Sequence, residues 1–302
     1  MIRFFIFIIC FYSFLSYVSG YSLGTAGTTF LKLGPTASAL GMSEAYSAIC
    51  TDVSSIYYNP AGLSKLTKMN LGFSYRILYQ DINYGNLLIG IPINNSFVIG
   101  AGLISLTINN IEKRSSDTEL PDSTFNTSDT AIILSLTKKN LIENFSIGSN
   151  LKMISSQLED KTASTFAIDF GGLYKFNDKL FFGLNLQNIG PGIKFIEETD
   201  PLPLSLNFGL GYVDDKFSVG CDINNSLVEL KSYLCLGLEY WFTKTVALRT
   251  GYKSGYDTAG LGTGVGLSLG FGLNLTNLKL DIAYVPYGYL GDTAIVSLSF
   301  GF

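Results

Sequence analysis

The sequence predicts an all-β protein, a 14-stranded antiparallel transmembrane β-barrel with an N-terminal hatch or plug segment. Three observations support this fold class. Only 15% of the 302 residues are charged, 14% are aromatic, and mean hydropathy is positive at +0.31. Apolar residues alternate with polar ones over most of the chain. Beyond the first twenty residues, no stretch approaches the about 20 apolar residues of a membrane-spanning helix. An apolar, weakly charged chain without helical spans is typical of a membrane barrel.

The composition also excludes several classes of function. The chain contains no histidine, which rules out a His-dependent catalytic triad and a His-ligated metal site. Its net charge of −4 and pI near 4.9 are opposite to the basic excess of a nucleic-acid binder. We therefore expect no enzyme activity, no cofactor, no metal and no nucleic-acid partner.

Residues 1–20 have the pattern of a secretory signal peptide. Arg3 precedes a solid apolar block, which ends in Ser16, Ser19 and Gly20. The alternative is an N-terminal membrane anchor, which the small residues at the end of the block disfavour. The signal predicts export, and together with a barrel it predicts the bacterial outer membrane.

Three cysteines remain after the signal peptide: Cys50, Cys221 and Cys235. Three are too few for a disulfide framework. Cys221 and Cys235 lie in successive predicted strands, and the sequence leaves open whether they pair.

Residues 21–68 form the predicted plug. Small residues dominate there, and the alternation is poor. Pro35 precedes a spacing over residues 36–48 that predicts a short helix, and Asn59, Pro60, Ala61 and Gly62 predict a turn. A 14-stranded barrel is too wide to be filled by the side chains of its own wall. We therefore expect this segment to occupy the lumen.

Residues 69–302 form the predicted barrel. Fourteen alternating segments are each long enough for a tilted transmembrane strand of about 9–11 residues. The even count agrees with bacterial barrels, and short connections alternate with several longer ones, notably 110–127 and 191–203. The predicted strands are 69–80, 83–93, 96–109, 128–140, 143–157, 163–176, 179–190, 204–213, 215–226, 231–242, 244–253, 260–273, 276–286 and 291–302.

Ionisable residues within these strands are predicted to face the lumen. Facing lipid at the midplane would cost roughly 2–4 kcal/mol each. Both signs occur in similar number, which argues against an ion-selective pore. The set favours a network that pairs charges or holds the plug, with contact to a ligand as the alternative role. Its members are Arg76, Lys152, Asp169, Asp222, Glu239, Arg249, Lys279 and Asp281.

The two ends of the chain resemble the PorV/PorQ family of outer-membrane proteins, which is related to FadL-type long-chain fatty-acid transporters. The resemblance rests on the run LGPTASALGMSEAYSAICTDVSSIYYNPAGL at residues 33–63 and on DIAYVPYGYLGDTAIVSLSFGF at residues 281–302. Ala294 stands where the family often has histidine. The resemblance implies a 14-stranded barrel with an N-terminal hatch.

The resemblance leaves two functions open. The leading hypothesis is a passive outer-membrane channel or transporter for hydrophobic compounds such as long-chain fatty acids. The ligand would contact apolar plug residues, namely Phe30, Leu31, Leu33, Tyr57 and Tyr58. The alternative is a PorV-like scaffold or cargo-binding component of a protein secretion system, with the loops at 110–127 and 191–203 as its partner surface. The expected partners are outer-membrane lipid, a hydrophobic small molecule and secretion-system proteins.

Overall fold

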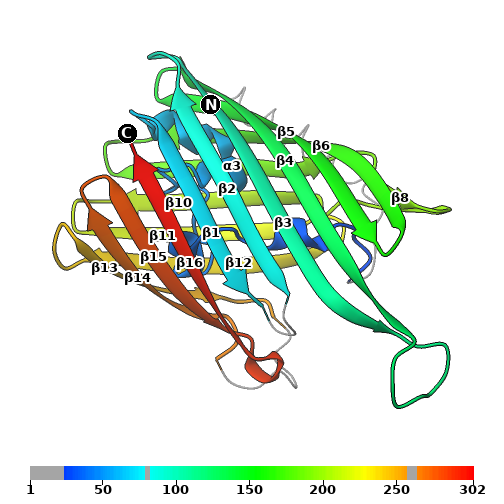
Figure 1. Cartoon of the computed structure of the whole chain (residues 1–302). Helices are drawn as coiled ribbons and strands as arrows, with labels where there is room; N and C mark the ends of the chain where they lie inside the picture. The colour runs from blue at the N-terminus through cyan, green and yellow to red at the C-terminus, as the bar shows by residue number, and fades with distance from the viewer. Residues whose placement is uncertain (1–23, 79–81, 257–263) are drawn as a thin grey trace.

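The computed structural model describes residues 24–78, 82–256 and 264–302, so the predicted signal peptide at 1–20 lies outside the described residues. Fourteen antiparallel strands form one closed barrel (Figure 1), which confirms the predicted all-β barrel and its strand count. None of the helices in the described part of the chain is long and apolar enough to cross a membrane.

The barrel strands follow one another around the wall in chain order. They are β1 (Asn70–Ile77), β2 (Asn83–Pro92), β3 (Phe97–Lys113), β4 (Ser123–Ile142), β5 (Phe145–Leu158), β6 (Lys161–Lys175), β7 (Leu180–Ile189), β10 (Ser205–Val213), β11 (Phe217–Ser226), β12 (Lys231–Trp241), β13 (Val246–Lys253), β14 (Leu267–Leu275), β15 (Leu278–Pro286) and β16 (Asp292–Gly301). The short helix η4 (Gly288–Leu290) connects β15 to β16.

Closure comes from the pairing of β1 with β16, where Phe73 lies opposite Leu298. Because every strand then has two neighbours, the barrel exposes no unpaired edge. The wall passes directly from β7 to β10, since β8 (Ile193–Phe195) and β9 (Glu198–Asp200) form a separate two-stranded hairpin.

The structure corrects two of the predicted loops. The loop expected at 110–127 is shorter, because β3 continues to Lys113 and β4 already begins at Ser123. The loop expected at 191–203 contains the β8–β9 hairpin. Both extensions are exposed and largely polar, so backbone pairing continues there without the apolar alternation that reveals a strand. The predicted start of a strand at 260 lies outside the described residues, and β14 begins at Leu267.

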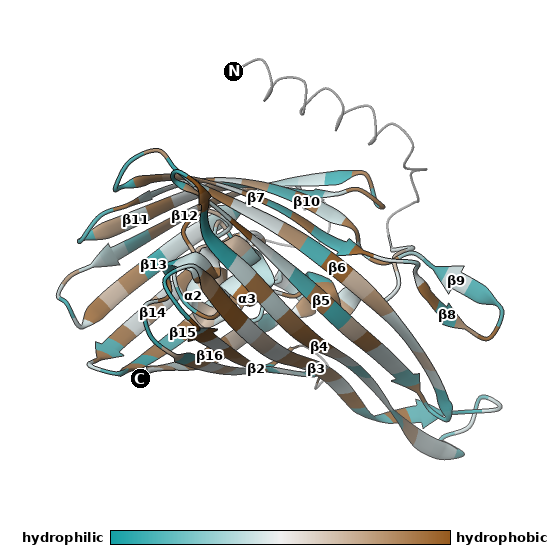
Figure 2. Cartoon of the chain, turned by 90° about the horizontal axis from the view of Figure 1, so that it is seen from above, coloured by the Kyte–Doolittle hydropathy of each residue, from teal (hydrophilic) through white to brown (hydrophobic). Residues whose placement is uncertain are grey.

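The two faces of the wall differ as their alternation requires. Large apolar side chains point outward, including Phe73, Leu103, Leu134, Phe170 and Leu236. Figure 2 shows the alternation as brown bands between paler and teal ones along the strands. The apolar surface runs over all fourteen strands, far beyond the scattered patches of a soluble monomer.

The N-terminal segment, residues 24–68, lies inside this wall. It contains η1 (Thr29–Lys32), α2 (Ala37–Leu40), α3 (Ser55–Tyr58) and η2 (Pro60–Lys65). Figure 2 shows α2 and α3 within the ring of strands. The helix expected over 36–48 is limited to α2, because Ser43 and Glu44 adopt positive φ angles of 50° and 64° that end the helical path.

Candidate functional site

The turn at Asn59 fixes the N-terminal segment to the wall. The Asn59 side chain is fully buried, and its Nδ2 donates to the carbonyl of Ser47 (2.9 Å) and to that of Gly172 on β6 (3.0 Å). Its Oδ1 accepts the N–H of Ala61 (3.1 Å), which caps η2, and Pro60 takes the first helical position. The turn therefore joins two parts of the N-terminal segment and a barrel strand through one side chain.

Inward-facing glycines let the backbone of the N-terminal segment approach the wall. A Cβ at any of five of them would lie 2.2–2.7 Å from a backbone atom of the segment. No side chain fits there without displacing main chain. The five are Gly148, Gly183, Gly220, Gly237 and Gly251. Gly62 allows a similarly close approach within the segment, where a Cβ would lie 2.5 Å from Cys50 Sγ.

A row of carboxamides on the wall binds the carbonyls of the segment. The side-chain Nδ2 groups of Asn86, Asn150 and Asn185 donate to the carbonyls of residues 35, 56 and 58 at 2.6–2.8 Å. Gln187 Nε2 donates to residue 57 at 2.6 Å. These residues were missed by the sequence reasoning. Their signal was available, because amides recur at alternate positions on the polar face of predicted strands.

The apolar side chains of the segment pack in one cluster against β2 to β6. Phe30, Leu31, Tyr57 and Tyr58 are buried in it, and Leu33 packs against its edge. The rings of the two tyrosines meet edge to face at 4.9 Å. The wall contributes inward apolar residues, which are Tyr84, Leu88, Val98, Ile104, Ala131, Ile133, Ile154 and Ala167. The inner face of β2 to β6 therefore carries an apolar cluster with buried polar residues between its members.

Lys152 and Asp169 form a fully buried ion pair on the inner wall. Their charged atoms are 2.8 Å apart. Lys152 Nζ also donates to Asn188 Oδ1 (2.7 Å), and Asp169 accepts the N–H of Asn188 (2.8 Å) and Nδ2 of Asn150 (2.8 Å). Because both charges have additional hydrogen bonds, the cost of burying them is offset.

A second network surrounds Arg249 on β13. Its Nε lies 2.7 Å from Glu239 on β12, and its Nη1 lies 2.8 Å from Asp281 on β15. Lys279 lies 3.7 Å from Asp281, and Trp241 Nε1 donates to Glu239 (2.9 Å). These four ionisable residues therefore form one balanced cluster of two cations and two anions.

Asp222 and Arg76 differ from the other six ionisable residues. Asp222 Oδ2 accepts the N–H groups of Tyr46 (3.1 Å) and Ser47 (2.8 Å), so this carboxylate holds the main chain of the N-terminal segment. The Arg76 guanidinium lies over the ring of Tyr84, 4.7 Å from its centroid. Among the described residues, none of its three nitrogens has a hydrogen-bond partner.

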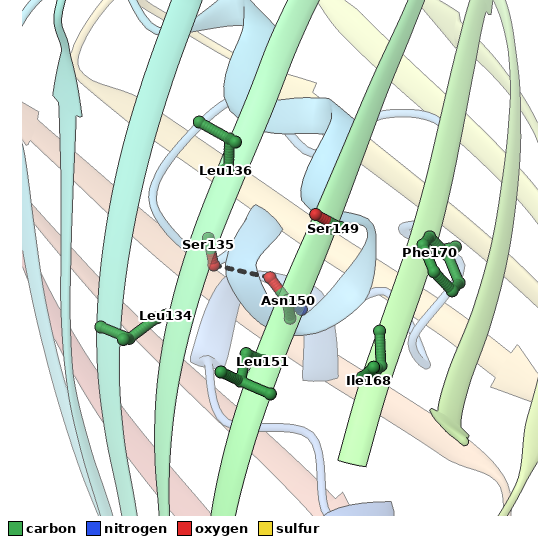
Figure 3. Close-up of a pocket in the computed structure, with 8 residues that line it drawn as sticks. All are labelled: Leu134, Ser135, Leu136, Ser149, Asn150, Leu151, Ile168 and Phe170. Atoms are coloured by element: carbon green, nitrogen blue, oxygen red, sulfur yellow. Dashed lines mark hydrogen bonds between the residues drawn. The ribbon is translucent and has the colours of Figure 1, made fainter. Parts of the chain in front are cut away.

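The outer wall carries a hollow of about 370 Å³ between β4, β5 and β6 (Figure 3). Ser149 leaves this space, since it lies between Leu136 and Phe170 where its neighbours are large. Ser135 and Asn150 also line it, and Ser135 Oγ donates to Asn150 Oδ1 at 2.6 Å. Asn150 in turn holds the N-terminal segment, so β5 lines the hollow and also contacts the segment in the lumen.

The three cysteines that the structure describes are free thiols. Cys221 faces outward, whereas Cys235 is buried opposite the inward-facing Asp222, so the two lie on opposite faces of the wall. No group of three or more potential metal ligands occurs within the described ranges.

The fold and the lumen together define a class of protein: a closed 14-stranded β-barrel with an apolar outer wall and a lumen occupied by its own N-terminal segment. The chain belongs to the PorV family, because it matches the family described as "Type IX secretion system protein PorV" over residues 21–231. No curated protein matches the sequence.

Solved structures of transporters share the barrel fold. The Ralstonia pickettii toluene transporter TbuX aligns with 95% of this chain and 99% of its own, at 12% identity and a TM-score of 0.61. The Pseudomonas putida toluene transporter TodX aligns with 94% of this chain and 98% of its own (14% identity, TM-score 0.58). A Pseudomonas aeruginosa FadL homologue aligns with 89% of this chain and 98% of its own (13% identity, TM-score 0.57).

Proposed function

We propose that the protein is an outer-membrane channel for the passive passage of hydrophobic compounds such as long-chain fatty acids, with the N-terminal segment as its hatch. The observation that carries the proposal is an apolar outer wall around a lumen that a non-covalently held segment occupies. Apolar outward side chains suit contact with lipid. The fold shared with two toluene transporters and a FadL homologue supports the same function.

The apolar cluster on β2 to β6 suits the path of such a compound. Tyr57 and Tyr58 on the segment face an inner wall that includes Leu88 and Ile133. Movement of the segment away from this wall would open an apolar surface within the barrel. A hydrophobic ligand would then pass along apolar protein surface without entering water.

A disulfide lock tests the hatch. Ser43 Oγ and Ser268 Oγ are 2.8 Å apart, so cysteines at both positions would place their sulfurs close to each other. The variant Ser43→Cys/Ser268→Cys, with the native cysteines replaced by alanine, ties the segment to β14. We expect cells with the oxidised variant to lose uptake of labelled oleate and toluene, and a reductant to restore it.

The matched controls are the same protein after reduction and the single variant Ser268→Cys. Equal uptake by the locked and reduced forms would contradict the hatch. Equal uptake by cells with and without the wild-type gene would contradict the channel itself.

A role in protein secretion is the second candidate, and membership of the PorV family favours it. Two apolar side chains stand exposed at the tips of hairpins: Leu120 (77% exposed) between β3 and β4, and Ile196 (79%) between β8 and β9. Exposed apolar tips suit contact with a protein partner. Crosslinking in intact outer membranes tests this role. If Leu120→Ser/Ile196→Ser removes co-purifying protein and leaves uptake unchanged, the scaffold role gains support; if no protein co-purifies with the wild type, the role is rejected.

A further inference from the structure

A cavity of about 240 Å³ lies inside the barrel between the N-terminal segment and the wall. Gly34, Ser43 and Glu44 of the segment line one side of it. Arg76 on β1 and Lys253 on β13 line the other. The segment leaves this part of the lumen open, and the charged residues of its wall make it unlike the apolar cluster on β2 to β6.

Arg76 contributes a buried guanidinium that has no hydrogen bond. Arg76 is only 1% exposed, yet its Nε, Nη1 and Nη2 all lack a hydrogen-bond partner among the described residues. A guanidinium offers five N–H donors in a planar fork, and buried donors are ordinarily satisfied. Arg249 provides the contrast within the same wall, since two carboxylates hold it at 2.7 and 2.8 Å.

The charges around the cavity do not balance. Lys253 Nζ is paired with Glu44, and Lys32 Nζ lies 2.8 Å from Glu229. Burial alone would raise the pKa of the Glu229 carboxyl, but the hydrogen bond and charge of Lys32 hold it below its usual range. Both lysines thus have a carboxylate of their own, and among the described residues that line the cavity Arg76 leaves an excess of one positive charge. An uncompensated charge in such a site is costly unless an anion meets it.

Arg76 is also held in a fixed position. Its guanidinium is stacked on Tyr84, whose hydroxyl donates to the carbonyl of Leu33 at 2.6 Å. Tyr233 and Tyr256 also line the cavity, with ring centroids 5.4 Å apart, and burial raises the pKa of Tyr256 to about 12, so its hydroxyl stays protonated at neutral pH. The cavity is therefore lined by a fixed guanidinium and by a pair of aromatic rings.

We propose that this cavity binds a small organic carboxylate, with the carboxylate on the Arg76 guanidinium and the body of the ligand beside Tyr233 and Tyr256. A single negative charge matches the single excess charge of the site, and a carboxylate matches the fork of an arginine. The volume is below the roughly 300–1,000 Å³ of sites for drug-sized ligands, which favours a small ligand over a long alkyl chain. The proposal is independent of the passage of hydrophobic compounds.

Calorimetric titration of the detergent-solubilised barrel with benzoate tests the site, and benzamide serves as the neutral ligand of the same shape. We expect saturable one-to-one binding of benzoate and at least a tenfold weaker interaction with benzamide. Inorganic phosphate forms a third arm. Binding of phosphate with no binding of benzoate would show a general anion site and overturn the carboxylate assignment.

The variants Arg76→Gln and Arg76→Lys separate binding from folding. We expect Arg76→Gln to lose benzoate binding by at least tenfold and to unfold at the same or a higher temperature without ligand, because it removes an unpaired buried charge. Arg76→Lys keeps the charge without the fork and should bind with intermediate affinity. Wild-type binding by Arg76→Gln, equal binding of benzoate and benzamide, or no benzoate binding by the wild type would each overturn the proposal.

Discussion

The close approach of the N-terminal segment to β5 makes Gly148 a sharp test of how the segment is seated. A Cβ in Gly148→Ala would lie 2.4 Å from the carbonyl carbon of Pro60 and 2.5 Å from the nitrogen of Ala61, where ordinary contacts are 3.4–4 Å. The peptide between these residues must therefore retreat by about 1 Å, by the range of ordinary contact distances. Two hydrogen bonds hold it in place: Thr137 Oγ1 donates to the Pro60 carbonyl (2.7 Å), and the Ala61 N–H donates to Asn59 (3.1 Å).

The cost follows from these contacts. Overpacking costs about 1–3 kcal/mol and each lost hydrogen bond about 1 kcal/mol, so we expect the segment to be destabilised by about 2–5 kcal/mol. Hydrogen exchange of the Ala61 amide should then be faster by roughly 30-fold or more. Gly85→Ala is the matched control, because its Cβ would meet only ordinary contacts at 3.5 and 3.6 Å. If the free energies of opening derived from hydrogen exchange differ by less than about 0.5 kcal/mol between the two variants, close approach is not the reason for glycine at position 148.

Three further perturbations test the polar and thiol contacts of the lumen. Asp222→Ala leaves two buried main-chain N–H groups without an acceptor and should destabilise the segment by about 3–5 kcal/mol in hydrogen exchange, whereas Asp215→Ala at an exposed position of the turn between β10 and β11 should change little. Arg249→Gln should lower the free energy of unfolding in urea by about 3–5 kcal/mol because it removes the ion pair of Glu239 and leaves Asp281 paired with Lys279 at 3.7 Å alone, and adding Asp281→Asn should recover part of this loss. Burial raises the pKa of the Cys50 thiol to about 11, so maleimide at pH 7.5 should label Cys50 only in protein whose segment has left the lumen, and prompt labelling of the closed protein would contradict its burial.

The sequence was sufficient for the barrel because strands with an apolar outer face need an apolar residue at every second position. The last strand shows this directly, with Ala294 and Val296 outward and Ile295 and Ser297 inward. Alternation fails where the chain leaves the apolar band, so the ends of β3 and β4 beyond 109 and before 128 were missed. These strand ends pair through backbone hydrogen bonds, and the pattern of side chains does not reveal such bonds.

The partners of the inward residues could be predicted much less well. Alternation states which face a side chain occupies, but not which neighbour lies beside it across the sheet. Arg76 and Arg249 therefore look equivalent in the sequence, although one has two carboxylates and the other has none. The apolar cluster on β2 to β6 could be anticipated in part, since Leu87-Leu88-Ile89 is a continuous apolar run that places apolar side chains on both faces of β2.

The seam between β1 and β16 has a consequence for how the protein is made. The Pro35 carbonyl accepts a hydrogen bond from Asn86 on β2, and the Ala37 N–H donates to Ser297 on β16, so the start of α2 bridges the strands on both sides of β1. During biogenesis the first part of the chain to be synthesised therefore meets the last strand, because the seam between β1 and β16 closes against the start of α2.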